Sequence, residues 1–284
     1  MLHLWALIGV LSISFSAVFV RLASVSPLTA TFYRAAYAVP VLAGLWRAQR
    51  SRDDRTVGSR LVAFASGTIL ALDLAFWHSS IALIGAGLAT VIANVQVVFV
   101  AAAVRWFYRE RLSGQTFGTI VAVLIGIAMT SGLARRDAYG ASPVLGVALG
   151  VIAGGCYAGF LLVFRAANRR LVPPSGPLLD ATIGTVVGAL LCAPFDRGFL
   201  FTPTWPAHGW LVLLALVSQV IGWLFIAIAL PRLPAVETSI LLLVQPVFAL
   251  VWGVLFFAEH LSPLQWAGSA LVLAGVARVS RQEP

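Results

Sequence analysis

Residues 88–104 read LATVIANVQVVFVAAAV, a run with no charged side chain. A transmembrane β-strand alternates apolar and polar residues, and this run does not alternate. It is typical of a membrane-crossing helix, which needs about 20 predominantly apolar residues. The rest of the chain has the same character. Of its 284 residues, 60% are apolar or aromatic and 10% are charged, and the mean hydropathy is +0.96.

This composition excludes several classes of protein. An average soluble domain has roughly 25% charged residues, so a soluble enzyme and a disordered chain do not fit. The net charge of +9 does not indicate nucleic-acid binding, because the basic residues are scattered between long apolar runs. We therefore predict an all-α integral membrane protein that contacts membrane lipids and no nucleic acid.

Apolar segments of spanning length recur ten times along the chain. They lie near residues 4–23, 27–46, 61–81, 86–107, 115–134, 143–165, 177–194, 208–230, 235–257 and 263–280. Ten helices of about 20 residues leave only short loops and tails, without room for a catalytic domain outside the membrane.

The arginines predict the orientation of these spans. With the N-terminus inside the cell, the inner loops and tails carry fourteen arginines and the outer loops carry four. Basic residues favour the cytoplasmic side of a membrane. We therefore expect both termini in the cytoplasm, with Arg21 on the outer side and Arg34 within a span.

The chain also repeats itself. A shift of 149 residues places three polar residues on identical ones: Gln96 on Gln245, Glu110 on Glu259 and Ser113 on Ser262. The two Glu corners are expected to fasten adjacent spans. We predict two five-span halves, residues 1–136 and 137–284. Since five is odd, the second half enters the membrane in the opposite sense, and such inverted repeats are common in secondary transporters.

The two copies resemble the drug/metabolite transporter superfamily, in its ten-helix EamA type. The resemblance rests on GAGLATVIANVQVVF…RERLSGQTFG…LIG at residues 85–126 and PAVETSILLLVQPVF…AEHLSPLQWAG…LAG at 234–275. The stretch ATFYRAAYA at 30–38 is also similar to that family. Within it, the chain is most similar to the YddG-type exporters of aromatic and other amino acids.

The resemblance implies a multi-pass protein of the bacterial cytoplasmic (inner) membrane. It implies export of small metabolites, above all amino acids, by alternating access around a central cavity between the halves. Drugs or nucleotide sugars are alternative substrates, and a non-transporting partner or flippase-like subunit is an alternative role. The resemblance implies no cofactor and does not set the oligomeric state.

Ionisable side chains inside spans are costly and are functional candidates. Asp73 lies midway along the third span, where it serves either as a coupling site or partner for a substrate amine, or as a structural partner of Arg34. Trp77 shares the face of Asp73. Arg34 could bind a substrate carboxylate, but we prefer a structural role in which it pairs with Asp73 or Asp180.

Four further side chains complete the candidate substrate-binding set. His78 and Tyr157 are polar aromatic residues within spans, each with a structural alternative as a satisfied core residue. Gln96 and Gln245 are uncharged amides at membrane depth, at equivalent repeat positions. We take Trp77, His78 and Tyr157 as the first choice, with Asp73, Gln96 and Gln245 as the second.

An enzyme is the competing class. It would need histidines and carboxylates gathered near one face. The four histidines lie at positions 3, 78, 208 and 260, in different spans and on both sides. The sequence contains no motif for a metal ion, a cofactor or a phosphoryl group. We therefore predict no enzymatic activity and no metal site.

Overall fold

The computed structural model describes residues 2–96, 98–100, 102–103, 114–130, 139–167, 173–202, 204–229 and 244–280. Within these residues every regular element is a helix and no strand is present. The Glu110 copy of the repeated corner lies outside the described residues, whereas the Glu259 copy lies within them.

The first predicted span is two helices, α1 (Leu2–Ser14) and α2 (Ser16–Ala23). The hydroxyls of Ser12 and Ser14 donate to the carbonyl oxygens of Ile8 and Leu11, each at 2.7 Å. Hydroxyl bonds to the preceding turn often bend helices, and α1 ends at Ser14. The sequence had predicted one uninterrupted span here.

Capping residues set the start of the next two helices. Helix α3 (Pro27–Gln49) follows Ser26, whose hydroxyl accepts from the Thr29 amide at 3.3 Å. Helix α4 (Val57–Ile84) follows Thr56, which caps it in the same way at 3.2 Å. A short helix η1 (Arg50–Arg52) lies between them.

Gly85 separates α4 from α5 (Ala86–Ala93). Its φ of +83° is a conformation that favours glycine, and a Cβ there would overlap the carboxyl group of Glu259. The chain can therefore turn sharply only because this residue has no side chain. Helix α7 (Gly114–Thr130) follows further along.

The second part of the chain forms a similar series. Its elements are α8 (Pro143–Ala167), α9 (Ser175–Cys192), η2 (Ala193–Phe195), α10 (Ala207–Leu213), the π-helical segment η3 (Leu214–Gly222), α11 (Trp223–Ala229), α13 (Val244–Phe257) and α14 (Pro263–Ser280). Segments α10, η3 and α11 form one continuous helical stretch over the predicted span 208–230.

Four of these stretches are long and apolar enough to cross a membrane: Val57–Ile84, Pro143–Phe164, Ser175–Phe195 and Ala207–Ile228. Shorter apolar helices occupy Leu7–Ala23, Ala86–Val100 and Gln245–Phe257. Large apolar side chains point outward from several helices: Leu61, Leu72, Leu124, Leu145, Leu191 and Phe256. An apolar exterior of this kind suits a lipid environment.

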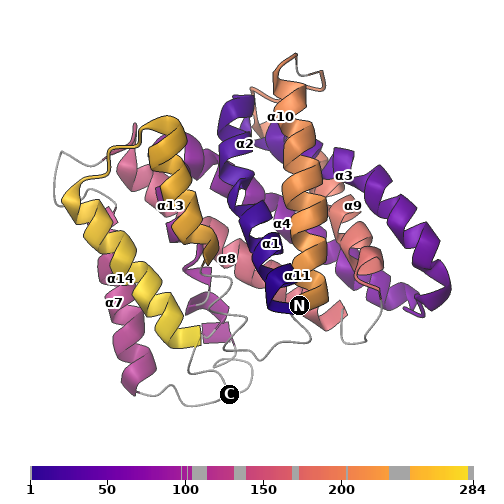
Figure 1. The fold of residues 1–284 in the computed structure, drawn as a ribbon, viewed down its shortest axis with the longest axis horizontal. Coiled ribbons are helices and arrows are strands. Elements are labelled where there is room, and N and C mark those ends of the chain that lie inside the picture. Colours follow the sequence, from indigo (N-terminus) through magenta and orange to yellow (C-terminus); the bar gives the residue numbers. More distant parts are fainter. Residues whose placement is uncertain are drawn as a thin grey trace.

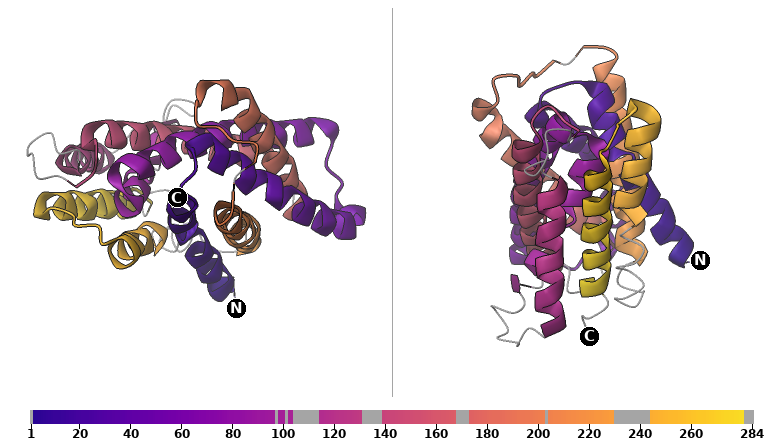
Figure 2. Two further views of the ribbon diagram at one scale, coloured as in Figure 1. Left: turned by 90° about the horizontal axis from the view of Figure 1, so that it is seen from above. Right: turned by 90° about the vertical axis from the view of Figure 1, so that its left-hand side faces the viewer.

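Helix α4 is central to the packing. It lies against α8 and α9, and α3 also packs on α9. Helices α5 and α13 pack together, as do α7 and α14 on one side of the molecule (Figure 1). Figure 1 and the right-hand view of Figure 2 show that α1 begins and α14 ends at the same end of the bundle. We call this the terminal end, and the opposite one the far end.

Candidate functional site

A buried polar cluster lies between helices of both parts of the chain. Arg34 of α3 donates through Nε to Oε1 of Gln219 in η3 at 2.8 Å, and through Nη1 to the Ser16 hydroxyl at 3.0 Å. Gln219 in turn donates to the Thr182 hydroxyl at 3.4 Å. Both Arg34 and Gln219 are almost fully buried. The preferred structural interpretation of Arg34 thus has a physical basis, with Gln219 as its partner.

Asp73 and Tyr157 belong to the same cluster. Each interacts electrostatically with Arg34, and they interact with one another. No described residue forms a hydrogen bond or an ion pair with the Asp73 carboxylate; its interaction with Arg34 is electrostatic only. Asp73 is 6% exposed. A buried carboxylate without donors is costly, so it is available to a cationic group that enters the cluster.

Aromatic rings surround Tyr157. It stacks on Phe160 at 5.9 Å between ring centroids and meets Trp223 edge-on at 6.3 Å. Phe160 also stacks on Phe164 at 5.3 Å. The cluster is therefore bordered by an apolar wall made by α8 and α11.

Trp77 and His78 differ in what they contact. The Trp77 ring is buried and lies 5.3 Å from the His78 ring. Nδ1 of His78 lies 3.0 Å from the Thr31 hydroxyl and 3.1 Å from the Pro27 carbonyl oxygen, so α3 holds the imidazole. Nε2 of His78 has no hydrogen-bond partner among the described residues.

The repeated amides are held differently. Gln96 is buried, and its Oε1 has no hydrogen-bond partner among the described residues. Gln245 is half-buried in the first turn of α13. Gln96 lies just beyond the end of α5 at Ala93, and α5 packs against α13. No described hydrogen bond joins either amide to Asp73 or Tyr157.

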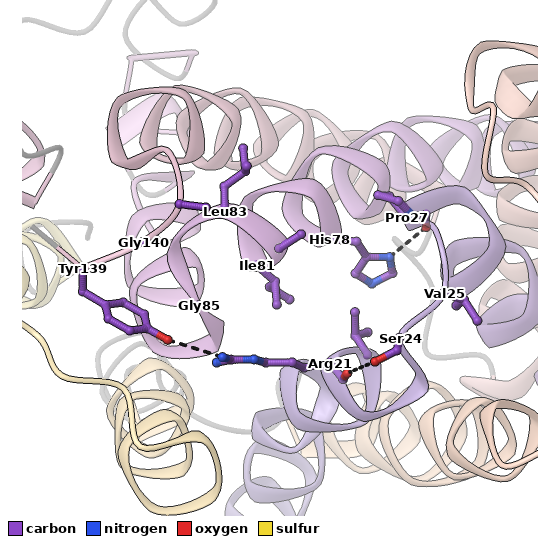
Figure 3. Close-up of a pocket in the computed structure, with 13 residues that line it drawn as sticks. Arg21, Ser24, Val25, Pro27, His78, Ile81, Leu83, Gly85, Tyr139 and Gly140 are labelled. Atoms are coloured by element: carbon purple, nitrogen blue, oxygen red, sulfur yellow. Dashed lines mark hydrogen bonds between the residues drawn. The ribbon is translucent and has the colours of Figure 1, made fainter.

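A pocket of about 480 Å³ opens at the far end, between α2, α4 and the segment 139–141 (Figure 3). Its polar lining includes Arg21, Ser24, His78 and Tyr139. The sequence pattern did not single out Arg21 or Tyr139, because both lie in or next to loops where polar residues are ordinary.

Glu259 connects this region to both parts of the chain. Its buried carboxylate accepts from the Ala86 amide at 2.7 Å and the Gly87 amide at 3.3 Å, at the start of α5, and forms an ion pair with Arg21. Burial raises the pKa of Glu259, while these donors act in the opposite direction. Fastening of adjacent spans was the expectation; the carboxylate instead caps a helix of the other part.

An ion-pair network lies at the terminal end. Arg55 donates to both carboxylate oxygens of Asp53, at 2.8 and 2.9 Å, and forms an ion pair with Asp180 at 2.8 Å. Trp46 Nε1 also donates to Asp53 at 2.8 Å. These bonds, chiefly from Arg55, lower the pKa of Asp53 to about 2. Asp180 therefore pairs with Arg55 and not with Arg34, the alternative partner considered above.

No group of three metal-ligating side chains gathers anywhere in the described part of the chain. Within the described residues, titratable groups come together in the Arg34 cluster, the Arg21–Glu259 pair, the Asp53–Arg55–Asp180 network and the hydrogen-bonded Tyr37–His208 pair. Each is an ion-pairing or hydrogen-bonding arrangement between helices.

Comparison with known proteins identifies the family. The model of the EamA-like transporter family matches residues 1–132 and again residues 144–281. The chain belongs to this family. The sequence resemblance had indicated the same family of membrane transporters.

Individual relatives are more distant. The uncharacterized transporter YwfM of Bacillus subtilis is 28% identical over 137 residues, which are 48% of this chain and 46% of YwfM. An uncharacterized transporter of Archaeoglobus fulgidus is 26% identical over 201 residues, 70% of this chain and 69% of that protein. The threonine/homoserine exporter RhtA of Escherichia coli K12 is 30% identical over 134 residues, 45% and 43% of the two chains. The matches thus span less than half of YwfM and RhtA.

One solved crystal structure matches the fold along almost the whole chain. The TM-score is 0.65, and the match covers 99% of this chain and 98% of the other at 17% sequence identity. At that identity the likeness shows the fold alone.

Proposed function

We propose that this chain is an exporter of amino acids across the bacterial cytoplasmic membrane, working by alternating access. The proposal rests on one observation. Arg34, Asp73 and Tyr157 meet Gln219 in a buried polar cluster, to which helices of residues 1–136 and 137–284 both contribute. The relation to RhtA, whose name describes export of two amino acids, supports the substrate class.

The proposed architecture is ten spans in two inverted halves, 1–136 and 137–284. The helix contacts support it. Helix α4 on α8 corresponds under the repeat to α11 on α1, and α4 on α9 corresponds to η3 on α3, and all four contacts occur. The separate family matches to 1–132 and 144–281 also support two similar halves.

The arginine distribution supports cytoplasmic termini, and the common end of α1 and α14 fits an even number of crossings. The terminal end of the bundle then faces the cytoplasm. The far end, with Arg21 and Glu259, faces outward.

The cluster offers complementary groups to an amino acid. The Asp73 carboxylate has no described donor and would take the ammonium group. The ring of Tyr157, with Phe160 and Trp223, offers an apolar wall to the side chain. Arg34 has two donors committed to Gln219 and Ser16, so its role is to set the electrostatic potential of the cluster and to hold α3 against η3.

Counterflow in proteoliposomes tests the proposal. Vesicles are loaded with one unlabelled amino acid, and entry of its labelled form is followed for Trp, Phe, Met, Thr and Lys. Counterflow needs no known energy source, because the outward flux of unlabelled substrate drives labelled uptake. Transient accumulation of any member supports the proposal; no accumulation in liposomes that hold folded protein would refute it.

Variants locate the site. Asp73→Asn and Trp77→Ala are expected to reduce counterflow at normal membrane insertion. Trp266→Ala is the matched control, because the Trp266 side chain is exposed on α14 and lies outside the cluster. If Asp73→Asn transported like the control, the substrate would not bind at this cluster, and unchanged transport by Trp77→Ala would remove Trp77 from the binding site.

A further inference from the structure

The turn between α3 and α4 is rich in arginine. Residues 46–60 read WRAQRSRDDRTVGSR, which contains five arginines and two aspartates. This turn lies at the terminal end and at the outer edge of the bundle, where α3 passes into α4 (Figure 1 and the left-hand view of Figure 2). In a chain that spans a membrane, a segment placed directly after a span lies at the level of the lipid head groups.

Hydrogen bonds fix the backbone of this turn. The Arg55 side chain is buried and bonds to both carboxylate oxygens of Asp53. The Asp53 carboxylate also accepts from Trp46 Nε1, and the Asp53 amide donates to the Arg50 carbonyl oxygen at 3.1 Å. The chain around Arg50 is therefore held in place by the protein itself, so a ligand at the turn meets a surface that is already ordered.

The exposed surface of the turn is basic. Arg47, Arg50 and Arg52 are exposed, and their side chains form no hydrogen bond or ion pair with a described residue. Arg47 lies in the last turn of α3, and Arg50 and Arg52 belong to the single turn of η1 that follows. Helical rises of about 1.5 and 2.0 Å per residue place these three arginines within roughly 9 Å along the chain. The turn exposes one carboxylate, Asp54, against these three charges, so its surface is positive.

Exposed apolar side chains lie on both sides of the arginines. Leu45 is exposed near the end of α3, and Val57 and Leu61 are 74% and 61% exposed in the first two turns of α4. The Arg60 guanidinium lies over the Trp46 ring at 5.4 Å, so the start of α4 is held against the end of α3. Tryptophan favours the interface between membrane and water. Positive charge and apolar surface thus adjoin, as the head group and acyl chains do in a phospholipid.

We infer that the α3–α4 turn binds an anionic phospholipid, with its phosphate on Arg47 and Arg50 and an acyl chain along Leu61. Clusters of basic residues next to a span are typical of such sites. A zwitterionic lipid has the same phosphate, but its own cation cancels the charge that attracts the arginines. A soluble phosphate has no chain to cover Leu61. The inference needs a chain that spans a membrane and does not depend on which solute is exported.

Fluorescence quenching by brominated lipids tests this site. The two native thiols, Cys156 and Cys192, are free and are first replaced by Ala. A fluorophore is attached to Leu61→Cys beside the arginines, or to Leu191→Cys as the matched control. Leu191 is 69% exposed near the end of α9, at the far end of the bundle. The full chain is reconstituted in phosphatidylcholine that contains a rising mole fraction of phosphatidylglycerol with brominated acyl chains.

Quenching at Leu61→Cys should saturate at a low mole fraction of phosphatidylglycerol, whereas quenching at Leu191→Cys should rise in proportion to the mole fraction. With the bromine on phosphatidylcholine, quenching at Leu61→Cys should fall as unlabelled phosphatidylglycerol is added. An arginine near a membrane surface contributes about a fivefold preference for anionic lipid. The mole fraction for half-maximal quenching should therefore rise about fivefold in Arg47→Gln and about 25-fold when Arg50→Gln is added.

A second pair of substitutions controls for net charge. Arg197→Gln with Arg278→Gln removes the same charge from two exposed arginines outside the turn, one of them in the last turn of α14 at the terminal end. This control should keep the half-maximal mole fraction of the parent protein. Quenching by brominated phosphatidylcholine alone should be the same in every variant, which verifies that each has folded and inserted.

Three outcomes would overturn the inference. Proportional quenching at Leu61→Cys would leave the arginines with a role in orientation alone. An equal loss in the charge control would show that net charge attracts the lipid without a site. Displacement of the lipid by inorganic phosphate, but not by sodium chloride of equal ionic strength, would make a soluble anion the occupant. None of these measurements follows transport, so a failed counterflow assay would count against export and leave the lipid site standing.

Discussion

Glu259→Ala should destabilise the protein more than its position in a loop suggests. The carboxylate is fully buried in the turn between α13 and α14. It accepts from the amides of Ala86 and Gly87, both buried at the start of α5, and pairs with Arg21. These residues are far from Glu259 in sequence, so the substitution loosens α13–α14 from α2 and α5 together.

The magnitude follows from the groups left without a partner. Each buried N–H that loses its acceptor costs about 1–3 kcal/mol. Two amides therefore set a gross loss of about 2–6 kcal/mol. Removing the carboxylate also relieves its own burial cost, and Arg21 can turn to water because it is 31% exposed. These offsets place the expected net loss in the lower half of that range, at about 3 kcal/mol.

Thermal unfolding of the purified protein in detergent measures this loss. A change of 1 kcal/mol corresponds to about 2–4 °C in chains of 150–250 residues, so Glu259→Ala should lower Tm by about 6–12 °C. Glu259→Gln keeps one acceptor oxygen and should fall between Ala and the parent. The neighbouring His260→Ala is the control, because its side chain is exposed and such changes stay within about 0.5 kcal/mol.

A double-mutant cycle with Arg21→Gln isolates the ion pair. Coupled neighbours show interaction energies of about 0.5–3 kcal/mol, and independent sites add within about 0.5 kcal/mol. If the stability losses of the two single variants simply add in the double variant, the Arg21–Glu259 ion pair contributes nothing to stability. A Glu259→Ala protein as stable as His260→Ala would refute the capping of α5 as well.

Three further predictions concern other levels of the bundle. Asp53→Asn should make the free energy of unfolding less dependent on pH in acid. Arg55 holds the Asp53 pKa at about 2, so the stabilisation by this carboxylate is complete above the unfolded pKa of about 3.9 and is lost as pH falls toward 2. Unfolding measured at a series of pH values tests this. Gly67→Ala should lower the free energy of unfolding by about 1–3 kcal/mol, since a Cβ there would overlap the α9 backbone at Ala181. Gly44→Ala is the control, because a Cβ at Gly44 meets open space and should be neutral or stabilising. Comparison of the two Tm values tests this. Arg34→Lys should lower both Tm and counterflow rate, because one ammonium group cannot reproduce the directed bonds to Gln219 and Ser16, and an unchanged Tm would contradict this.

Much of the fold could be predicted from the apolar runs alone, because a membrane helix must satisfy its own backbone. The described helices overlap the predicted spans, although α5 ends at Ala93, early in the span predicted near 86–107, and α13 is described only from Val244. The break at Phe15 and the π-helical segment around Gln219 could not be predicted. They depend on local hydroxyl hydrogen bonds and on tertiary packing, and neither produces a periodic pattern of apolar residues in the sequence.

The site was less predictable. Asp73 and Tyr157 could be found because a carboxylate or a hydroxyl inside a span needs a reason to be there. The association of Arg34 with Gln219 could not, since 185 residues separate them. His78 was grouped with Tyr157, but its ring lines the far-end pocket. Arg21 drew no attention because an arginine at a span end is ordinary.

Polar contacts between residues 1–136 and 137–284, the two proposed halves, occur at three levels, and this distribution bears on how the protein would move. At the far end Glu259 holds Ala86 and Arg21; in the middle Gln219 holds Arg34; at the terminal end Asp180 holds Arg55. If the halves rock about the middle level, the far-end contacts can break while the terminal-end contacts stay intact, and the reverse. Opening either end then breaks one set of ion pairs and leaves the other intact. The proposed inward-open and outward-open states would therefore be similar in free energy. The same reasoning requires that the central bond between Arg34 and Gln219 persist in both states, because it lies at the pivot.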